Sequence, residues 1–219
     1  MLPLFTSYSC NKKEPLIQDI LSKWKSLNPD FNVLYFSDSD VKNFFKETPY
    51  FNIYKKMKNG VAIADFFRIC YINKYGGFWF DIDLEPTKVN ITREHNIQLF
   101  DAGYGNISYM FIGGMPNQKL FNDVINEVIE NIEKNIPNKY QDIMEITGPR
   151  VIQNIIFKKL NIKNFDGNFK AQDKSQLHLT NTDYEFNYSR INFKKKKTNT
   201  YKLLQKKYNK EQYDFYNFV

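Results

Sequence analysis

Residues 75–83 read Tyr75-Gly76-Gly77-Phe78-Trp79-Phe80-Asp81-Ile82-Asp83. The Gly-Gly pair predicts a tight turn, and the aromatic residues after it predict a short strand. In an extended chain, residues two apart point to the same side. We therefore expect Asp81 and Asp83 to project together while Phe80 and Ile82 pack on the opposite face. Two clustered carboxylates repel each other unless a cation lies beside them.

Carboxylate oxygens are hard ligands that suit Mn²⁺ or Mg²⁺, especially when substrate phosphates complete the coordination shell. The acidic pair therefore predicts a divalent metal site. A solvated strand end that carries two acidic residues is the alternative, and the surrounding residues decide between the two.

Residues 59–75, directly upstream, have apolar side chains at three- and four-residue steps, which predicts an amphipathic helix that ends at Gly76. Asp65 and Arg68 share one face of this helix. As a surface ion pair they would contribute almost nothing to stability. Both charges lie among bulky apolar neighbours, however, so we expect them to point into the same cavity as the aspartates. The apolar positions are Val61, Ala64, Ile69, Ile72 and Tyr75.

Residues 64–83 closely resemble the signature of the DXD-motif sugar transferase family, of the glycosyltransferase family 32 type. That signature reads small-Asp-x-x-Arg, then Lys-Tyr-Gly-Gly, then an aromatic or aliphatic residue followed by x-Asp-x-Asp. Every element is present at the right spacing. The group includes the yeast initiating outer-chain mannosyltransferase and, remotely, the clostridial glucosylating toxins. Weaker likenesses extend the match over about residues 2–160, at Leu2–Tyr8, Trp24–Phe36, Met110–Pro116 and Thr147–Pro149.

The resemblance implies a GT-A type α/β fold: a single domain with a Rossmann-like, mostly parallel sheet flanked by helices, and a donor site at the carboxyl ends of the strands. It implies a hexosyltransferase that uses a UDP- or GDP-sugar and Mn²⁺ or Mg²⁺, acts on a glycan, protein or lipid-linked acceptor, and retains the anomeric configuration. Asp83 is expected to bind the metal directly, and Asp81 through water or the ribose hydroxyls. Asp65 and Arg68 are expected to hold hydroxyls of the transferred sugar.

Three further substrate-binding residues are expected. Gly76 and Gly77 permit a close backbone approach that larger residues would block, and Tyr8 follows the opening strand. Similar enzymes supply a third metal ligand, a His often followed by a Trp, from a C-terminal segment. His178 lies in a segment that alternates like a strand, so it is a better candidate than His95. The His-then-Trp ending is missing, and a lone His in a strand is more often a packed or surface residue.

Extended and helical segments alternate along the chain, which is typical of an α/β sheet. We expect strands at residues 4–7, 32–36, 97–101 and 108–113. We expect helices at residues 15–27, 38–45, 50–58, 117–135 and 150–160. Asp38 is the expected N-cap of the second helix.

The chain has 219 residues, enough for one domain with a sizeable core. No stretch reaches the ~18 apolar residues that would cross a bilayer, and the N-terminus lacks a secretory signal pattern, which favours a cytoplasmic location. The two cysteines, Cys10 and Cys70, match no metal spacing. We expect Cys70 to be a core thiol and no disulfide to join the two.

The net charge of the whole chain is +7, and residues 190–219 hold nine Lys or Arg against two acidic residues, which is also +7. Residues 1–189, the expected GT-A domain, are therefore neutral overall. The basic, aromatic tail at 190–219 is expected to be solvated, with peripheral membrane contact as the alternative. No nucleic-acid binding is expected, because the aromatic residues of the domain follow core spacing rather than interleaving with Lys and Arg.

Two other hypotheses stay open: a catalytically silent relative and, less favoured, a nucleic-acid-binding protein that acts through the basic tail at 190–219. A catalytically silent relative would bind a nucleotide sugar or a glycan without transfer, and the intact set of Asp65, Arg68, Asp81 and Asp83 argues against it. A hydrolytic glycosidase is less favoured, because its two acids usually need a separation set by opposite faces of the sugar.

Overall fold

The structure is a computed structural model that describes residues 1–9, 14–89, 96–101, 107–135, 140–159 and 186–190. The elements follow in the order β1 (Leu2–Ser7), α1 (Pro15–Leu27), β2 (Phe31–Phe36), α2 (Asp38–Lys46), α3 (Phe51–Lys56), α4 (Gly60–Tyr75), β3 (Gly77–Phe80), β4 (Ile97–Asp101), β5 (Phe111–Gly114), α5 (Lys119–Lys134), α6 (Tyr140–Ile146), α7 (Pro149–Lys159) and β6 (Phe186–Arg190). Among these, no helix is both long and apolar enough to cross a membrane.

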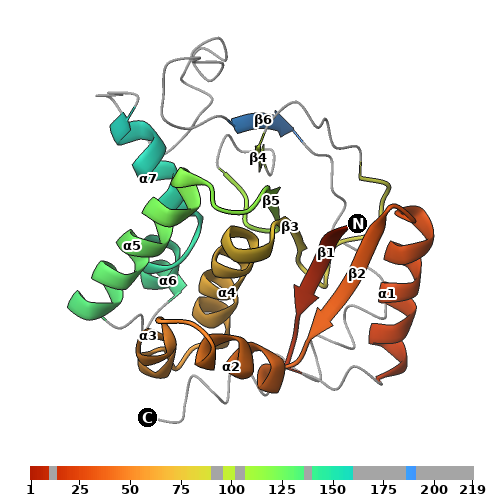
Figure 1. Ribbon diagram of the computed structural model, residues 1–219, viewed down its shortest axis with the longest axis horizontal. Coiled ribbons are helices and arrows are strands. Elements are labelled where there is room, and N and C mark those ends of the chain that lie inside the picture. The colour runs from red at the N-terminus through yellow and green to blue at the C-terminus, as the bar shows by residue number, and fades with distance from the viewer. Residues whose placement is uncertain (10–13, 90–95, 102–106, 136–139, 160–185, 191–219) are drawn as a thin grey trace.

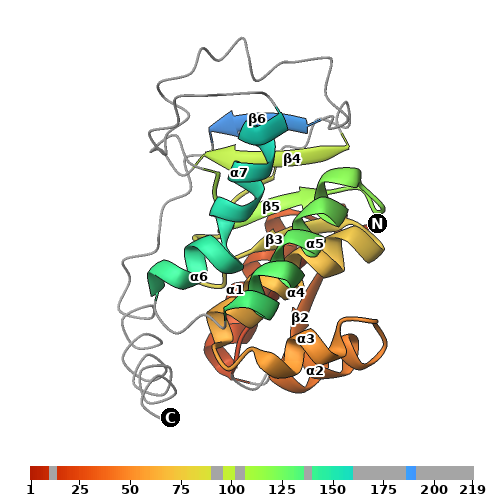
Figure 2. The same cartoon turned by 90° about the vertical axis from the view of Figure 1, so that its left-hand side faces the viewer.

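The strands form one six-stranded sheet in the order β2-β1-β3-β5-β4-β6 (Figures 1 and 2). β1 pairs in parallel with β2 and β3, and β4 pairs in parallel with β6. Only β5 runs against its neighbours β3 and β4. The expected mostly parallel α/β sheet is confirmed. Because of these directions, β1, β2, β3 and β4 all end at one end of the sheet, where β5 begins; we call this the carboxyl end.

Helices cover both faces of the sheet, which gives three layers (Figure 1). On one face, Trp24 of α1 packs with Leu4, Phe78, Phe80 and Phe111 of the strands. On the other face, a larger apolar cluster joins α2 to α7 with the alternate strand residues. Successive strand residues point to opposite faces, so neighbours such as Phe78 and Trp79 belong to different clusters.

α4 contributes most of its residues to the larger cluster and lies between α5 and the strands of the sheet (Figure 1). An uninterrupted run of its residues, from Asp65 to Ile72, is buried. The amphipathic pattern that we expected is therefore wrong in detail: Val61 and Ala64 are half-buried and Tyr75 is exposed. A helix covered on all sides has no apolar stripe to reveal its inner face. Cys70 of this helix is a buried free thiol, as expected, and burial raises its pKa.

Most element bounds agree with the sequence expectations to within a few residues. α2 is a correction: its N-cap is Ser37, whose side chain and that of Asp40 form a capping box, and Asp38 is the first helical residue. β5 begins at Phe111, three residues later than expected. α6 and β6 were not expected. β6 also includes Arg190, the first residue of the expected tail, so the sheet passes the expected domain boundary by one residue. The rest of the tail lies outside the described residues.

Close backbone contacts fix the position of β3 within the sheet. Gly76 and Gly77 have φ angles of 71° and 109°, which side chains disfavour. A Cβ on Gly77 would lie 2.4 Å from the carbonyl oxygen of Pro3 in β1. On the other side of β3, Gly113 of β5 pairs with Phe78, and a Cβ there would lie 2.0 Å from the ring of Phe78. Glycine at these positions allows β1, β3 and β5 to meet.

Replacing Gly77 with Ala is expected to lower the free energy of unfolding by more than ~2 kcal/mol, because the methyl group would meet Pro3 in an already disfavoured backbone conformation. Gly60, the first residue of α4, is the matched control, since a Cβ there would meet nothing within 4 Å. Gly60→Ala is expected to leave the stability unchanged or to raise it by up to ~1 kcal/mol. Urea unfolding measures both, and equal effects would contradict the close approach at Gly77.

Candidate functional site

The two aspartates of the motif lie at the carboxyl end of the sheet, and both are half-buried. The backbone N–H of Asp81 donates to the carbonyl of Met110 at 2.8 Å, just before β5 begins. The N–H of Leu84 then donates to the carbonyl of Asp81 at 3.0 Å, which closes a turn. The expectation of an extended chain through Asp83 is therefore wrong, because the chain leaves the sheet after Asp81. Phe80 and Ile82 do pack together against α1, as expected.

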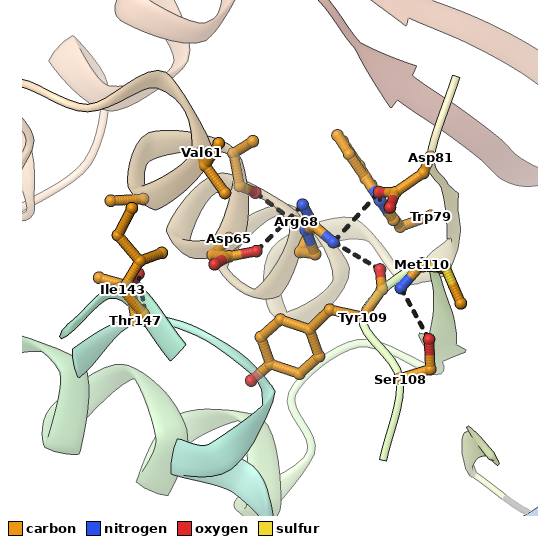
Figure 3. Close-up of polar contacts among 12 residues, drawn as sticks. Val61, Asp65, Arg68, Trp79, Asp81, Ser108, Tyr109, Met110, Ile143 and Thr147 are labelled. Carbon is orange, nitrogen blue, oxygen red and sulfur yellow. Dashed lines mark hydrogen bonds and ion pairs between the residues drawn. The ribbon is translucent and has the colours of Figure 1, made fainter. Parts of the chain in front are cut away.

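Arg68 of α4 connects the elements of the site (Figure 3). Its Nη2 lies 3.1 Å from Asp65 Oδ1, and its Nη1 lies 3.3 Å from Asp81 Oδ1. Nη1 also donates to the backbone carbonyl of Tyr109, and Nε donates to that of Ala64 at 3.1 Å. Only 6% of the Arg68 side chain is exposed. The guanidinium is thus a buried cation between two carboxylates, and the expected meeting of Asp65, Arg68 and Asp81 is found.

Trp79 of β3 contacts two of these groups at once (Figure 3). Its indole Nε1–H donates to Asp81 Oδ1 at 2.7 Å. The Arg68 guanidinium carbon lies 4.4 Å from the centroid of the indole ring, within the range of a cation–π contact. The ring also packs edge-on against Phe5 and Phe67. Trp79 and Asp81 are two residues apart and therefore face the same side as α4.

Asp65 has an unusual electrostatic environment. Burial raises the pKa of Asp65 to about 7, and the negative charge of Asp81 adds to the rise, whereas Arg68 and a hydrogen bond with Thr147 oppose it. Tyr109 lies beside this group. Its hydroxyl is buried and has no hydrogen-bond partner among the described residues. Burial, together with the charge of Asp65, raises the pKa of Tyr109, so this phenol is neutral.

The raised pKa of Asp65 predicts a pH dependence of stability. Between about pH 4 and pH 7, folded Asp65 keeps a proton that the unfolded chain has released. The free energy of unfolding should therefore fall as the pH rises through this window, by at most ~1.4 kcal/mol per pH unit, and level off above the folded pKa. Asp65→Asn should remove this slope.

Urea unfolding of both proteins between about pH 5 and pH 8 tests the prediction. The difference between the two curves cancels other groups, such as Asp38, whose pKa burial also raises. Parallel curves would show that Asp65 titrates in the folded protein as it does in the unfolded chain.

The other expected site residues fall in different places. Tyr8 follows β1 at the carboxyl end, where its backbone N–H donates to Phe36 at 3.2 Å, so it lies one strand away from Asp81. Gly77 lies at the opposite end of β3, about 13 Å from Asp81 along the strand, against Pro3, and Gly76 precedes it, against Pro116. The structure does not bring them to the carboxylates. His178 lies outside the described residues, as does His95.

The described residues can supply a metal ion with only part of a coordination shell. Among them there is no group of three or more His, Cys, Asp or Glu side chains gathered to hold a metal. Asp81 and Asp83 offer hard carboxylate oxygens, and one oxygen of Asp81 already accepts bonds from Arg68 and Trp79. This donor set fits Mg²⁺ or Mn²⁺, which commonly take few protein ligands and complete the shell with phosphate oxygens and water.

In comparison with known proteins, the same residues are similar to a family of sugar-binding sequences. Residues 15–98 match the family described as glycosyltransferase sugar-binding region containing DXD motif. The match includes α4, β3 and both aspartates. No curated protein matches the chain. Residues 15–98 are thus similar to the sugar-binding region of this family.

The fold is also similar to a solved structure, the PaToxG glycosyltransferase. The superposition has a TM-score of 0.56 and 17% sequence identity, and it covers 82% of this chain and 75% of that chain. At this identity the likeness concerns the fold alone. The fold class is therefore α/β of the GT-A type, as expected.

Trp79, Tyr109 and Thr147 are members of the site to which the sequence analysis assigned no role. The period of two along β3 places Trp79 on the same side as Asp81, so a signal for it existed. Tyr109 reaches Arg68 through its backbone carbonyl, a contact that any residue type can make. Nothing in the residue type of Tyr109 indicated this contact.

Proposed function

We propose that the chain is a metal-dependent glycosyltransferase that moves a hexose from a nucleotide-diphosphate sugar to a hydroxyl acceptor with retention of configuration. One observation supports the proposal most directly. Arg68 joins Asp65 of α4 to Asp81 at the carboxyl end of β3, within the segment that matches the DXD sugar-binding region. Ligands bind at the carboxyl ends of strands in open α/β sheets.

The charges of the site suit the departure of a diphosphate. A divalent ion bound at Asp83 and Asp81 would offset the negative charge that grows on the leaving group. We assign Asp83 as the direct ligand. Asp81, whose Oδ1 is committed to Arg68 and Trp79, serves the ion through water or binds the ribose hydroxyls.

Asp65 and Arg68 orient the transferred sugar through its hydroxyls, which fixes the anomeric carbon for attack. Their side chains are each 6% exposed, so each can present only an edge to the sugar. Tyr8 follows β1, the strand that pairs with β3, and in this proposal it contacts the donor. The donor is a UDP- or GDP-sugar, and the acceptor is a hydroxyl group of a glycan, a protein or a lipid-linked compound.

A donor screen tests this function. The purified protein is incubated with a panel of UDP- and GDP-sugars in Mn²⁺, in Mg²⁺ and in chelator, and release of nucleoside diphosphate is measured. We expect one donor to be turned over, and only with the metal. Calorimetric binding of a donor without any release would instead favour a silent nucleotide-sugar-binding protein. Neither binding nor release with any donor would refute the proposed function.

A further inference from the structure

The two tryptophans of the chain differ in their polar contacts. Both are almost fully buried, Trp24 at 0% and Trp79 at 2% exposure. Trp24 is a core residue whose ring centroid lies 4.4 Å from that of Phe80, and its Nε1–H has no hydrogen-bond partner among the described residues. The Nε1–H of Trp79 instead donates to Asp81. Core packing alone does not account for that contact.

Three groups at Trp79 form a closed set of contacts (Figure 3). The indole N–H of Trp79 donates to Asp81 Oδ1 at 2.7 Å, and Arg68 Nη1 reaches the same oxygen at 3.3 Å. The guanidinium of Arg68 in turn lies against the indole ring at 4.4 Å. A carboxylate that accepts two bonds on one oxygen is fixed in its rotation. Its other oxygen, Oδ2, then points in a defined direction.

The indole is itself held in place. Phe5 of β1 and Phe67 of α4 pack edge-on against it, with ring centroids at 5.6 Å and 6.4 Å. The Asp81 side chain, by contrast, is 30% exposed and would otherwise be free to sample several rotamers. Because the indole is fixed in the core, its hydrogen bond restricts the rotation of the Asp81 carboxylate, which is itself partly exposed.

We propose that Trp79 is a positioning residue of the site: its indole N–H and ring hold Asp81 and Arg68 so that Asp81 presents Oδ2 to the metal ion or to the donor. The proposal rests on the proposed function for its ligand, but the contact between Trp79 and Asp81 can be tested without any activity. Trp79 acts through Asp81 and Arg68 and need not touch the donor itself.

The kinetic test compares Trp79→Phe with Trp24→Phe. Each substitution keeps an aromatic ring and removes an N–H, but only the N–H of Trp79 has a partner. We expect Trp79→Phe to lower the kcat for donor turnover by about 10- to 100-fold, the usual loss when a group that orients a metal ligand is removed. We expect it also to raise the Mn²⁺ concentration that gives half-maximal rate. Trp24→Phe should change both by less than about twofold. Equal losses in the two variants, at equal thermal stability, would overturn the proposal.

The second test uses the indole N–H signals in a proton–nitrogen NMR spectrum. The chain has two tryptophans, so the two single variants assign the two signals. We expect the Trp79 signal to lie downfield and to move upfield in Asp81→Ala, while the Trp24 signal stays in place. If no donor is turned over, the proposed function fails while this spectrum still decides whether Trp79 holds Asp81. A Trp79 signal that does not move in Asp81→Ala would overturn it.

Discussion

Asp83→Asn is expected to lower metal-dependent donor turnover by about 100- to 1,000-fold, the typical loss when one group that stabilises a developing charge is removed. The amide has the same size as the carboxylate but lacks the charge that a divalent ion needs. The rate of nucleoside diphosphate release is measured over a range of Mn²⁺ concentrations. Because Asp83 is the proposed direct ligand, we expect the loss to be only partly recovered at high Mn²⁺.

Glu85→Gln is the matched control for this variant. Glu85 lies two residues further along and is exposed, so its replacement removes the same charge from the same stretch of chain. We expect its turnover to stay within about twofold of the wild type, since exposed charges are strongly screened. Circular dichroism confirms that both variants fold. If Asp83→Asn keeps full turnover, Asp83 does not bind the metal ion.

Arg68→Met is expected to destabilise the fold by about 3–5 kcal/mol, the usual cost of removing one partner from a buried ion pair. Methionine fills much of the same volume but leaves Asp65 and Asp81 close together without a cation. Arg68 lowers the pKa of Asp65, so its removal raises that pKa above the wild-type value of about 7, and the loss of stability should grow as the pH rises above about 7. Urea unfolding at about pH 8 measures the effect.

Two further variants distinguish the effect of the buried charge of Arg68 on stability from the effect of its packing. The double variant Arg68→Met with Asp65→Asn removes one of the stranded carboxylates and should recover part of the loss, so that the double variant is more stable than Arg68→Met alone. Arg150→Met is the surface control: its ion pair with Glu145 spans 3.3 Å, with both side chains about two-fifths exposed, at 41% and 43%. We expect it to cost less than ~1 kcal/mol. Similar losses for both arginines would show that the buried ion pairs of Arg68 contribute no more than an exposed pair, and a double variant no more stable than Arg68→Met would show that Arg68 acts through packing rather than charge.

Much of the site could be predicted because its signals are local. The Gly-Gly turn, the aromatic strand and the spacing of Asp65 and Arg68 all lie within residues 59–83. Local geometry then placed α4 and β3 correctly. The alternation of residues 78–83 could not predict where the chain turns after Asp81. The turn to Leu84 begins where the hydrogen bonds between β3 and β5 end, at the bond from Asp81 to Met110.

The remaining differences come from contacts between distant parts of the chain. The middle of α4, from Asp65 to Ile72, is buried because the sheet and other helices cover it, so the sequence pattern could not show which face of the helix points to the site. β6 pairs with β4 from far along the chain, and such pairing leaves little local signature. Ser37 and Asp38 are adjacent and both are favoured N-cap residues, so the sequence could not show at which of the two α2 begins.

The glycine beneath Phe78 also fixes the alignment of β3 against β5. A shift of one residue would place Phe78 either opposite Ile112, whose side chain is buried, or opposite Gly114, where even a Cβ would lie within 3 Å of Asn96 and Phe121. The same shift would turn Asp81 to the α1 face, away from Arg68, since alternate residues face opposite sides. The steric fit between Phe78 and Gly113 near one end of β3 thus favours the register in which Asp81, at the far end, meets Arg68.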